Sequence, residues 1–153
     1  MRHHDFGDGR WVVRLDPGED VLPCLAAFAA AAGVTAGYAT AIGSVDRLTL
    51  GFLDPETRAY LKRTFEEPME VASLTASFSM DGDQPLVHAH AVVGPRELIA
   101  YAGHLHAARV GAVLEVYVTA LPGRLGRAAV PDQPFLALLL PGEAPPGGSA
   151  PPR

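Results

Sequence analysis

The chain has 153 residues and a formal net charge of −5, so it lacks the overall basic charge by which nucleic-acid-binding proteins attract phosphate. Its length fits one domain with its own core, and a hydrophobic content of 48% is ordinary for a compact protein. No apolar run reaches the roughly 18 residues that a transmembrane helix needs.

The start of the chain and its cysteine content bear on the cellular compartment. Residues 1–5 carry charge, and no apolar segment of a secretory signal follows them. Cys24 is the only cysteine, so no disulfide can form within the chain. We therefore expect a cytoplasmic protein in which Cys24 serves the packing of a helix.

A first strand is predicted over residues 11–15, where apolar residues dominate. The residues before it are expected to form a mobile start. His3 and His4 are adjacent in this start, and we expect neither to bind a metal.

A helix is predicted to follow this strand. Asp16, Pro17 and Glu19 match a capping box with proline at the first helical position. Apolar residues then recur at helical spacing to about Ala32, and Gly33 stands where a left-handed glycine ends a helix.

From Tyr38 onward the hydrophobic period changes to two, which predicts β-strands. The expected strands are 38–44, 47–53, 60–65 and 70–80, with turns at 54–57 and 81–83. In the last of these strands Ser73, Thr75, Ser77 and Ser79 share one face, and Ala72, Leu74, Ala76 and Phe78 share the other. We therefore expect one face of the sheet in the core and the other polar and accessible.

Four of the six histidines form two pairs, His88/His90 and His104/His106, with the same-face spacing of a strand. Residues 94–97 read as a turn between them, which predicts an antiparallel hairpin. In that register His90 faces His104 and His88 faces His106. Since the Cβ atoms of opposed residues lie about 5 Å apart, one hairpin gathers four imidazoles.

Such a cluster favours a metal site. Three nitrogen ligands with one open position are typical of catalytic zinc, and imidazole is the commonest metal-ligand side chain. The alternatives are a solvated sheet face or a subunit contact lined by neutral histidines. A shift of the register by one residue would turn one pair away.

Glu115 interrupts an apolar strand predicted over 112–120. A buried carboxylate must be paired, protonated or bound to a metal. It is a tentative catalytic residue, as a fourth ligand, a partner that orients a histidine, or a general base. The alternative is an edge or subunit contact where it meets an arginine such as Arg109.

The end of the chain differs in composition. Residues 135–140 are a candidate strand to close the sheet, so residues 1–140 are predicted to form a single domain. Proline, glycine, serine and alanine dominate residues 141–153, which are expected to form a disordered tail. The arginines of segment 123–127 lack interleaved aromatic residues and are expected to lie in a solvated loop.

Several segments between Trp11 and Val118 together resemble the prokaryotic members of the PPC family (plants and prokaryotes conserved), also called DUF296. They are Ile42-Gly43-Ser44-Val45, residues 51–57, 71–75 and 87–92, Gly103-His104-Leu105, residues 108–111 and Glu115-Val116. The resemblance implies an α+β domain, a mostly antiparallel sheet flanked by one main helix, that assembles as a homotrimer. The histidine pattern favours a divalent metal, zinc in the first place and iron or nickel after it.

The family's histidines correspond to His88, His90 and His104, so the resemblance implies that these bind the metal. His106 stands where relatives usually carry an apolar residue, and it is an additional candidate ligand. The fold also resembles that of acetolactate decarboxylase, whose zinc is held by an HxH pair and a later histidine. Here the later histidine follows His90 by fourteen positions.

Two functions follow from these observations. One is a metal-binding association module of the PPC type, with DNA as a candidate partner. In plant relatives AT-hooks centred on Arg-Gly-Arg-Pro precede the domain, and residues 123–127 do not supply one. The alternative is a small zinc-dependent lyase or hydrolase acting on a carbonyl compound, in which Glu115 moves a proton and Arg47 or Tyr60 assists.

Overall fold

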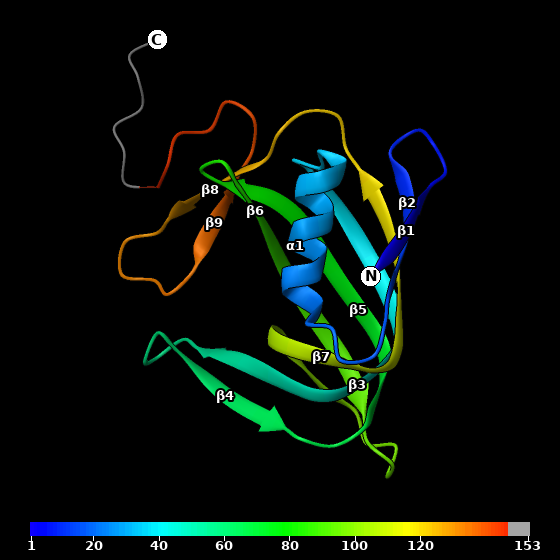
Figure 1. Ribbon diagram of the computed structural model, residues 1–153. Helices are drawn as coiled ribbons and strands as arrows, with labels where there is room; N and C mark the ends of the chain where they lie inside the picture. Colours follow the sequence, from blue (N-terminus) through cyan, green and yellow to red (C-terminus); the bar gives the residue numbers. More distant parts are fainter. Residues whose placement is uncertain (147–153) are drawn as a thin grey trace.

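One nine-stranded sheet with one helix on its inner face makes up the part of the chain that the computed structural model describes, residues 1–146 (Figure 1). The elements are β1 (Arg2–Asp5), β2 (Arg10–Leu15), α1 (Val21–Ala32), β3 (Gly37–Asp54), β4 (Ala59–Phe65), β5 (Met69–Asp81), β6 (Gln84–Gly94), β7 (Tyr101–Ala120), β8 (Gly126–Ala129) and β9 (Leu136–Leu139). The predicted α+β class with a mostly antiparallel sheet is confirmed.

Strands β3 and β7 form the centre of the sheet and pair with each other along most of their length. β2 continues the sheet beyond β7 and β5 continues it beyond β3, while β6 pairs with both β5 and β7. The sequence predicted two strands where β3 runs, over 38–44 and 47–53. It also predicted a histidine strand and a separate strand over 112–120 where β7 runs. Both predicted breaks are wrong, because β3 and β7 are continuous. Bulges near Gly43, Val45 and Leu50 interrupt the alternation without ending the strands.

The hydrophobic core lies between α1 and the inner face of the sheet. Val21, Leu25 and Phe28 of α1 are fully buried, as are Phe78 of β5 and Leu114 of β7. The helix contacts β6 and β7 and crosses in front of the strands (Figure 1). Part of the sheet face that turns away from α1 therefore remains open, including the exposed side chains of Tyr38, Ile42 and Tyr117.

The helix begins at Val21, four residues later than Pro17, where the sequence predicts its start. The backbone N–H of Asp16 does donate to the Glu19 carboxylate at 2.8 Å, as in a capping box. Gly18 has a φ of +82°, however, which no helix accepts, so these residues form a turn. At the other end, Gly33 has a φ of +68°, and the predicted glycine cap is confirmed.

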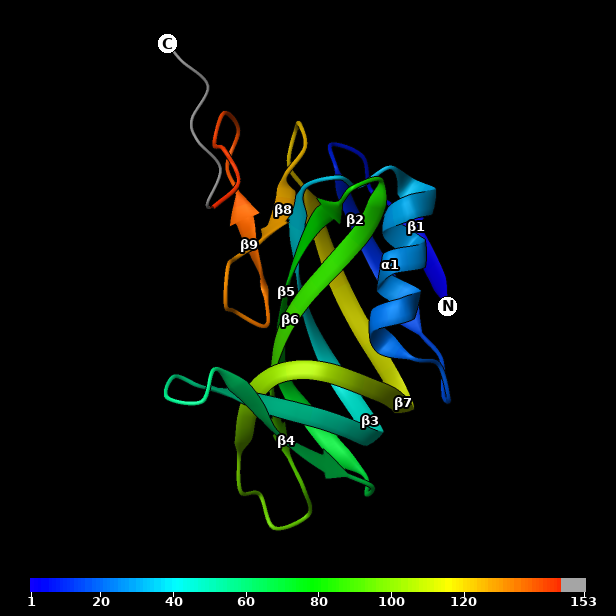
Figure 2. The ribbon, with the colours of Figure 1, turned by 90° about the vertical axis from the view of Figure 1, so that its left-hand side faces the viewer.

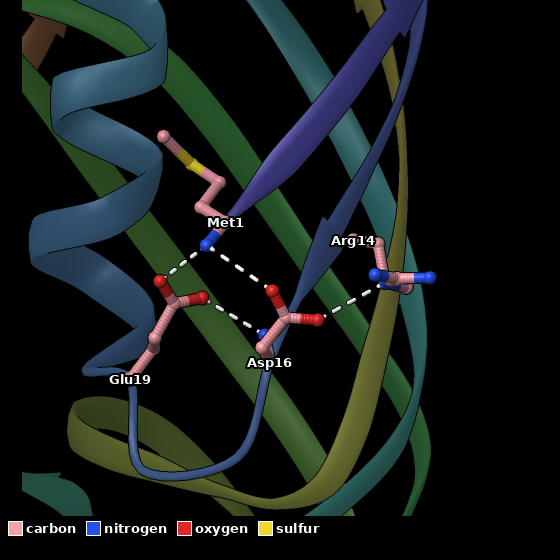
Figure 3. A network of polar contacts seen from close by, with 4 residues as sticks. All are labelled: Met1, Arg14, Asp16 and Glu19. Atoms are coloured by element: carbon pink, nitrogen blue, oxygen red, sulfur yellow. Dashed lines mark hydrogen bonds and ion pairs between the residues drawn. The ribbon is translucent and has the colours of Figure 1, made fainter.

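The sequence predicts a mobile start, and this prediction is wrong, because Arg2–Asp5 forms β1 and pairs with β2. The ammonium group of Met1 contacts the Glu19 carboxylate and lies 3.6 Å from Asp16, which also binds Arg14 at 3.1 Å (Figure 3). These contacts lower the pKa of Glu19, chiefly through its hydrogen bond to the ammonium group. They tie β1 to the turn that precedes α1.

Two hairpins project from the open face of the sheet, on the side opposite α1 (Figure 2). One is the tip of β3 and β4, and the other is β8 with β9. The predicted strand 135–140 thus exists, but among the described strands β9 pairs only with β8, and a single bridge between Met80 and Gly126 joins β8 to β5. The space between the hairpins is where the histidines lie.

Leu140 and Glu143 exchange two hydrogen bonds in a turn at the start of the predicted tail. The remainder of that tail, 147–153, lies outside the described residues. Within residues 1–146 no helix has the length and apolarity to cross a lipid bilayer.

Candidate metal centre

Three imidazole rings converge on the open face of the sheet. His88 and His90 come from β6 and His104 from β7, and each offers a ring nitrogen within 4.8 Å of the others. The ring centroids are 5.0 to 5.4 Å apart. Among the described residues, these three histidines are the group whose ligand atoms lie close enough together to hold a metal ion.

The strand alternation explains why these rings share a face. Ala89 and Ala91 point into the core and are almost fully buried, so His88 and His90 must point outward. The predicted pairing of His90 with His104 across β6 and β7 is confirmed. The hairpin register therefore brings the third ring to the first two.

His106 lies beside the triad but does not face His88 as predicted. The pairing of β6 with β7 ends at His90 and His104, and a bulge in β7 opposite Thr49 and Leu50 displaces His106. Its ring packs 4.6 Å from that of His104 and 4.8 Å from that of Tyr60. Gly51 makes room for it, since a Cβ there would lie 2.4 Å from His106 Nε2.

The surroundings favour the neutral form of His88, His104 and His106. Burial, reinforced by the neighbouring histidines and Lys62, lowers the pKa of His104 to about 4. Burial is also the first cause that lowers the pKa of His88 and of His106. At neutral pH these three rings therefore carry the unprotonated nitrogens that a metal requires.

Two buried ring nitrogens have no hydrogen-bond partner in the described structure, His104 Nδ1 and His106 Nε2. An unpaired buried polar atom is costly unless something else satisfies it. A metal ion bound by His88, His90 and His104 is one such partner. The donor set, the lowered pKa of His88 and of His104, and the orphaned nitrogen of His104 all fit a divalent metal.

The low pKa of His104 predicts that the metal-free protein loses stability on acidification. Between pH 6.5 and about 4 the unfolded chain binds a proton at this histidine and the folded chain does not. The free energy of unfolding therefore decreases as the pH is lowered through this range. We expect urea unfolding of chelator-treated protein to show this loss. His104→Gln should flatten the dependence, and His4→Gln, on the exposed β1, should not. Equal pH profiles for all three proteins would contradict it.

A cavity of about 1160 Å³ opens over the histidines between the two projecting hairpins. Its walls combine apolar side chains with three basic ones, Arg58, Lys62 and Arg127, and contain no acidic residue. Tyr60 lies in the wall, as predicted for an assisting residue. Arg47 does not, because it pairs with Glu66 at 3.2 Å.

Arg127 is the site residue that the sequence analysis missed. It was expected in a solvated loop, yet it is half-buried on β8, where its Nε donates to Ser79 Oγ at 2.8 Å. Ser79 was expected on the accessible polar face and is fully buried. The polar face of β5 is visible in the sequence and indicates that a polar group could cover it. No sequence pattern near β5 or near Arg127 shows that the two segments meet.

Glu115 lies apart from the histidines within one chain. It is exposed on β7, opposite Arg14 of β2 and Ile42 of β3, and it is not part of the cavity wall. Arg109, its predicted partner, pairs instead with Asp46 at 2.8 Å. The structure therefore brings the three family histidines together and leaves Glu115 out of their group.

Comparison with solved structures places the chain among similar proteins. A candidate DNA-binding protein from Bacteroides thetaiotaomicron is 31% identical with a TM-score of 0.84, covering 90% of this chain and 95% of its own. The metal-containing protein AF0104 from Archaeoglobus fulgidus is 32% identical with a TM-score of 0.79, covering 86% of this chain and 93% of its own.

A more distant likeness supports the predicted architecture. A Staphylococcus aureus protein of unknown function, described as similar to α-acetolactate decarboxylase, has a TM-score of 0.54 at 13% identity. The match covers 75% of this chain and 53% of that one, and it shows a shared fold alone. Among curated proteins the chain has no match.

The family model of the Plants and Prokaryotes Conserved (PCC) domain matches residues 5–122, which is most of the chain and contains all three histidines of the triad. This is the family that the sequence motifs resemble. The chain therefore belongs to the Plants and Prokaryotes Conserved domain family.

Proposed function

We propose that this protein is a zinc-binding association module that works as a homotrimer. The observation that carries the metal proposal is the convergence of His88, His90 and His104, whose ring nitrogens lie within 4.8 Å of one another. Imidazole suits several transition metals, and three protein nitrogens with an open position are the usual ligand set of accessible zinc. A metal-containing relative of 32% identity supports the same proposal.

The surrounding residues have defined tasks in this proposal. Bound zinc would supply a Lewis acid that faces the cavity. His88, His90 and His104 would hold it, and the Tyr60 ring packs beside this last ligand, 5.1 Å from the His104 ring. His106, next to His104, remains an additional candidate ligand.

The open face of the sheet supports assembly with copies of the same chain. Tyr38, Ile42 and Tyr117 lie on neighbouring positions of β3 and β7, and about half of each side chain is exposed: 53%, 52% and 49%. Large apolar side chains gathered on one face of a strand pair are typical of subunit contacts. Glu115 lies among them, so a role for it at the metal would require a neighbouring copy.

Zinc content and mass in solution test this proposal together. Protein without an affinity tag should carry close to one zinc per chain and have the mass of a trimer by light scattering. Ile42→Asp should shift the mass toward the monomer, while Leu61→Asp, exposed on β4, should not. Zinc at trace level after exposure to the metal would end the metal proposal, and a monomeric wild type would end the trimer.

The cavity favours a second candidate, a zinc-dependent lyase or hydrolase acting on a small carbonyl compound. Its volume of about 1160 Å³ is ample for such a substrate, and the histidines form part of its wall. Turnover that is lost with zinc would support the enzyme. An association module would keep its trimer and show no turnover.

DNA remains a candidate partner because a relative of 31% identity is named for it. We expect only weak duplex binding, since the net charge of the chain is −5. Direct phosphate contacts would make affinity fall steeply as salt rises. Tight binding with a steep salt dependence would contradict this expectation.

We further propose a cytoplasmic location, since the lone Cys24 leaves no internal disulfide.

A further inference from the structure

The guanidinium group of Arg127 lies in the cavity wall and has no acidic partner among residues 1–146. Its three hydrogen bonds in the described structure go to neutral oxygens: Ser79 Oγ at 2.8 Å, Leu136 O at 3.0 Å and Ser77 Oγ at 3.1 Å. A guanidinium has five N–H donors, so further donors remain. A partly buried cation whose acceptors are all neutral still lacks a compensating charge.

The position of Arg127 depends on a part of the chain outside the family match. The matched residues end at 122, and β8 and β9 follow them. Their hairpin projects from the side of the sheet opposite α1 (Figure 2). It adds Arg127, Phe135 and Leu136 to the wall of the cavity that the histidines also line. The hairpin thus gives this chain a cavity wall that the matched domain alone does not provide.

The charge of the cavity is opposite to that of the whole protein. Arg58, Lys62 and Arg127 line it without a single carboxylate, in a chain of net charge −5. The described salt bridges include none of these three residues. Basic residues that converge on one cavity without counter-charges attract an anion.

The apolar part of the wall indicates that this anion is organic. Phe52 and Leu53 from the tip of β3 and Phe135 and Leu136 from the β8–β9 hairpin lie around the basic groups. Binding cavities for small organic ligands pair such apolar walls with a few placed polar groups. An inorganic ion would leave these side chains without a contact.

We propose that the cavity binds a small organic carboxylate, with Arg127 as the residue that holds its charge. The proposal rests on the proposed function in one respect, namely that the other end of the ligand faces zinc on His88, His90 and His104. Arg127 itself needs no metal to bind a carboxylate, because planar guanidinium and carboxylate groups form paired hydrogen bonds.

Calorimetric titration with succinate tests the proposal, and uncharged succinamide is the matched probe. Zinc-loaded wild type should bind succinate and bind succinamide far more weakly. Arg127→Gln should weaken succinate binding by about tenfold to a hundredfold, the range for hydrogen bonds to a charged group. Arg124→Gln is the control, because Arg124 is exposed, contacts Gly82 and Asp83, and does not line the cavity.

Zinc is measured in every sample, so that failure of the zinc site can be distinguished from failure of the carboxylate site. If wild type holds no zinc, the titrations are repeated on the metal-free protein, where Arg127→Gln should still reduce succinate binding. Arg127→Lys keeps the charge and should bind with intermediate affinity, which provides a test if Arg127→Gln does not fold. Absence of succinate binding, equal binding of succinamide, or equal affinity in the Arg127 and Arg124 variants would overturn the carboxylate site.

Discussion

Replacing His104 with alanine is expected to lower zinc affinity by more than about a hundredfold, since even the loss of a residue that only supports a ligand costs 10- to 100-fold. His104 is the ring that comes from β7, and it lies 5.0 Å from His88 and 5.4 Å from His90. Without it two ligands remain on one strand. Competition with a chromogenic chelator measures the loss.

Matched variants separate a lost ligand from a disturbed fold. His4→Ala, on the exposed edge strand β1, should retain wild-type zinc affinity. His88→Ala and His90→Ala should behave like His104→Ala, while His106→Ala decides whether the fourth ring is a ligand. Equal zinc affinity in His104→Ala and His4→Ala would refute the proposed site.

Gly43→Ala is expected to destabilise the fold more than any surface substitution. Gly43 has a φ of +145°, and a Cβ there would lie 2.2 Å from the Val113 carbonyl oxygen and 2.9 Å from Leu114 Cα. The atoms that crowd it are backbone of β7, which cannot move aside cheaply. Backbone strain and overpacking together predict a loss of about 2 to 6 kcal/mol in the free energy of unfolding.

Urea unfolding of the metal-free protein measures this loss. Gly94→Ala is the control, because its φ is not left-handed and a Cβ there would only touch Ile99 O at 3.7 Å. We expect the control to remain within about 1 kcal/mol of wild type, as is usual where no clash or strained backbone is involved. Similar stabilities for the two variants would show that the bulge at Gly43 is not required.

Local patterns in the sequence were enough to predict most of the sheet. Alternation at 60–65 and 70–80 corresponds to β4 and β5, and the glycine after the helix ends it as expected. The same alternation predicted that His88 and His90 share a face. The reason is physical: side chains of a strand point to alternate sides, whatever the strand pairs with.

Bulges and long-range contacts explain the errors. β3 runs through the predicted break at residues 45–46 with only register shifts between Gly43 and Arg47, and a further bulge displaces His106 from its predicted partner. A bulge depends on how a neighbouring strand fits, so alternation within one strand does not reveal it. The acidic Glu115 illustrates the same limit, since its exposure depends on strands that pair beside it.

The sequence by itself determined the strand and helix types, the family, and the two histidine pairs that supply the triad, because each rests on local spacing or on motif order. Only the tertiary structure decided that His104 meets the first pair while His106 lies beside Tyr60. It alone brought Arg127 against Ser77 and Ser79, about fifty positions earlier in the chain. Contacts at such separations depend on chain topology, and no local pattern encodes them.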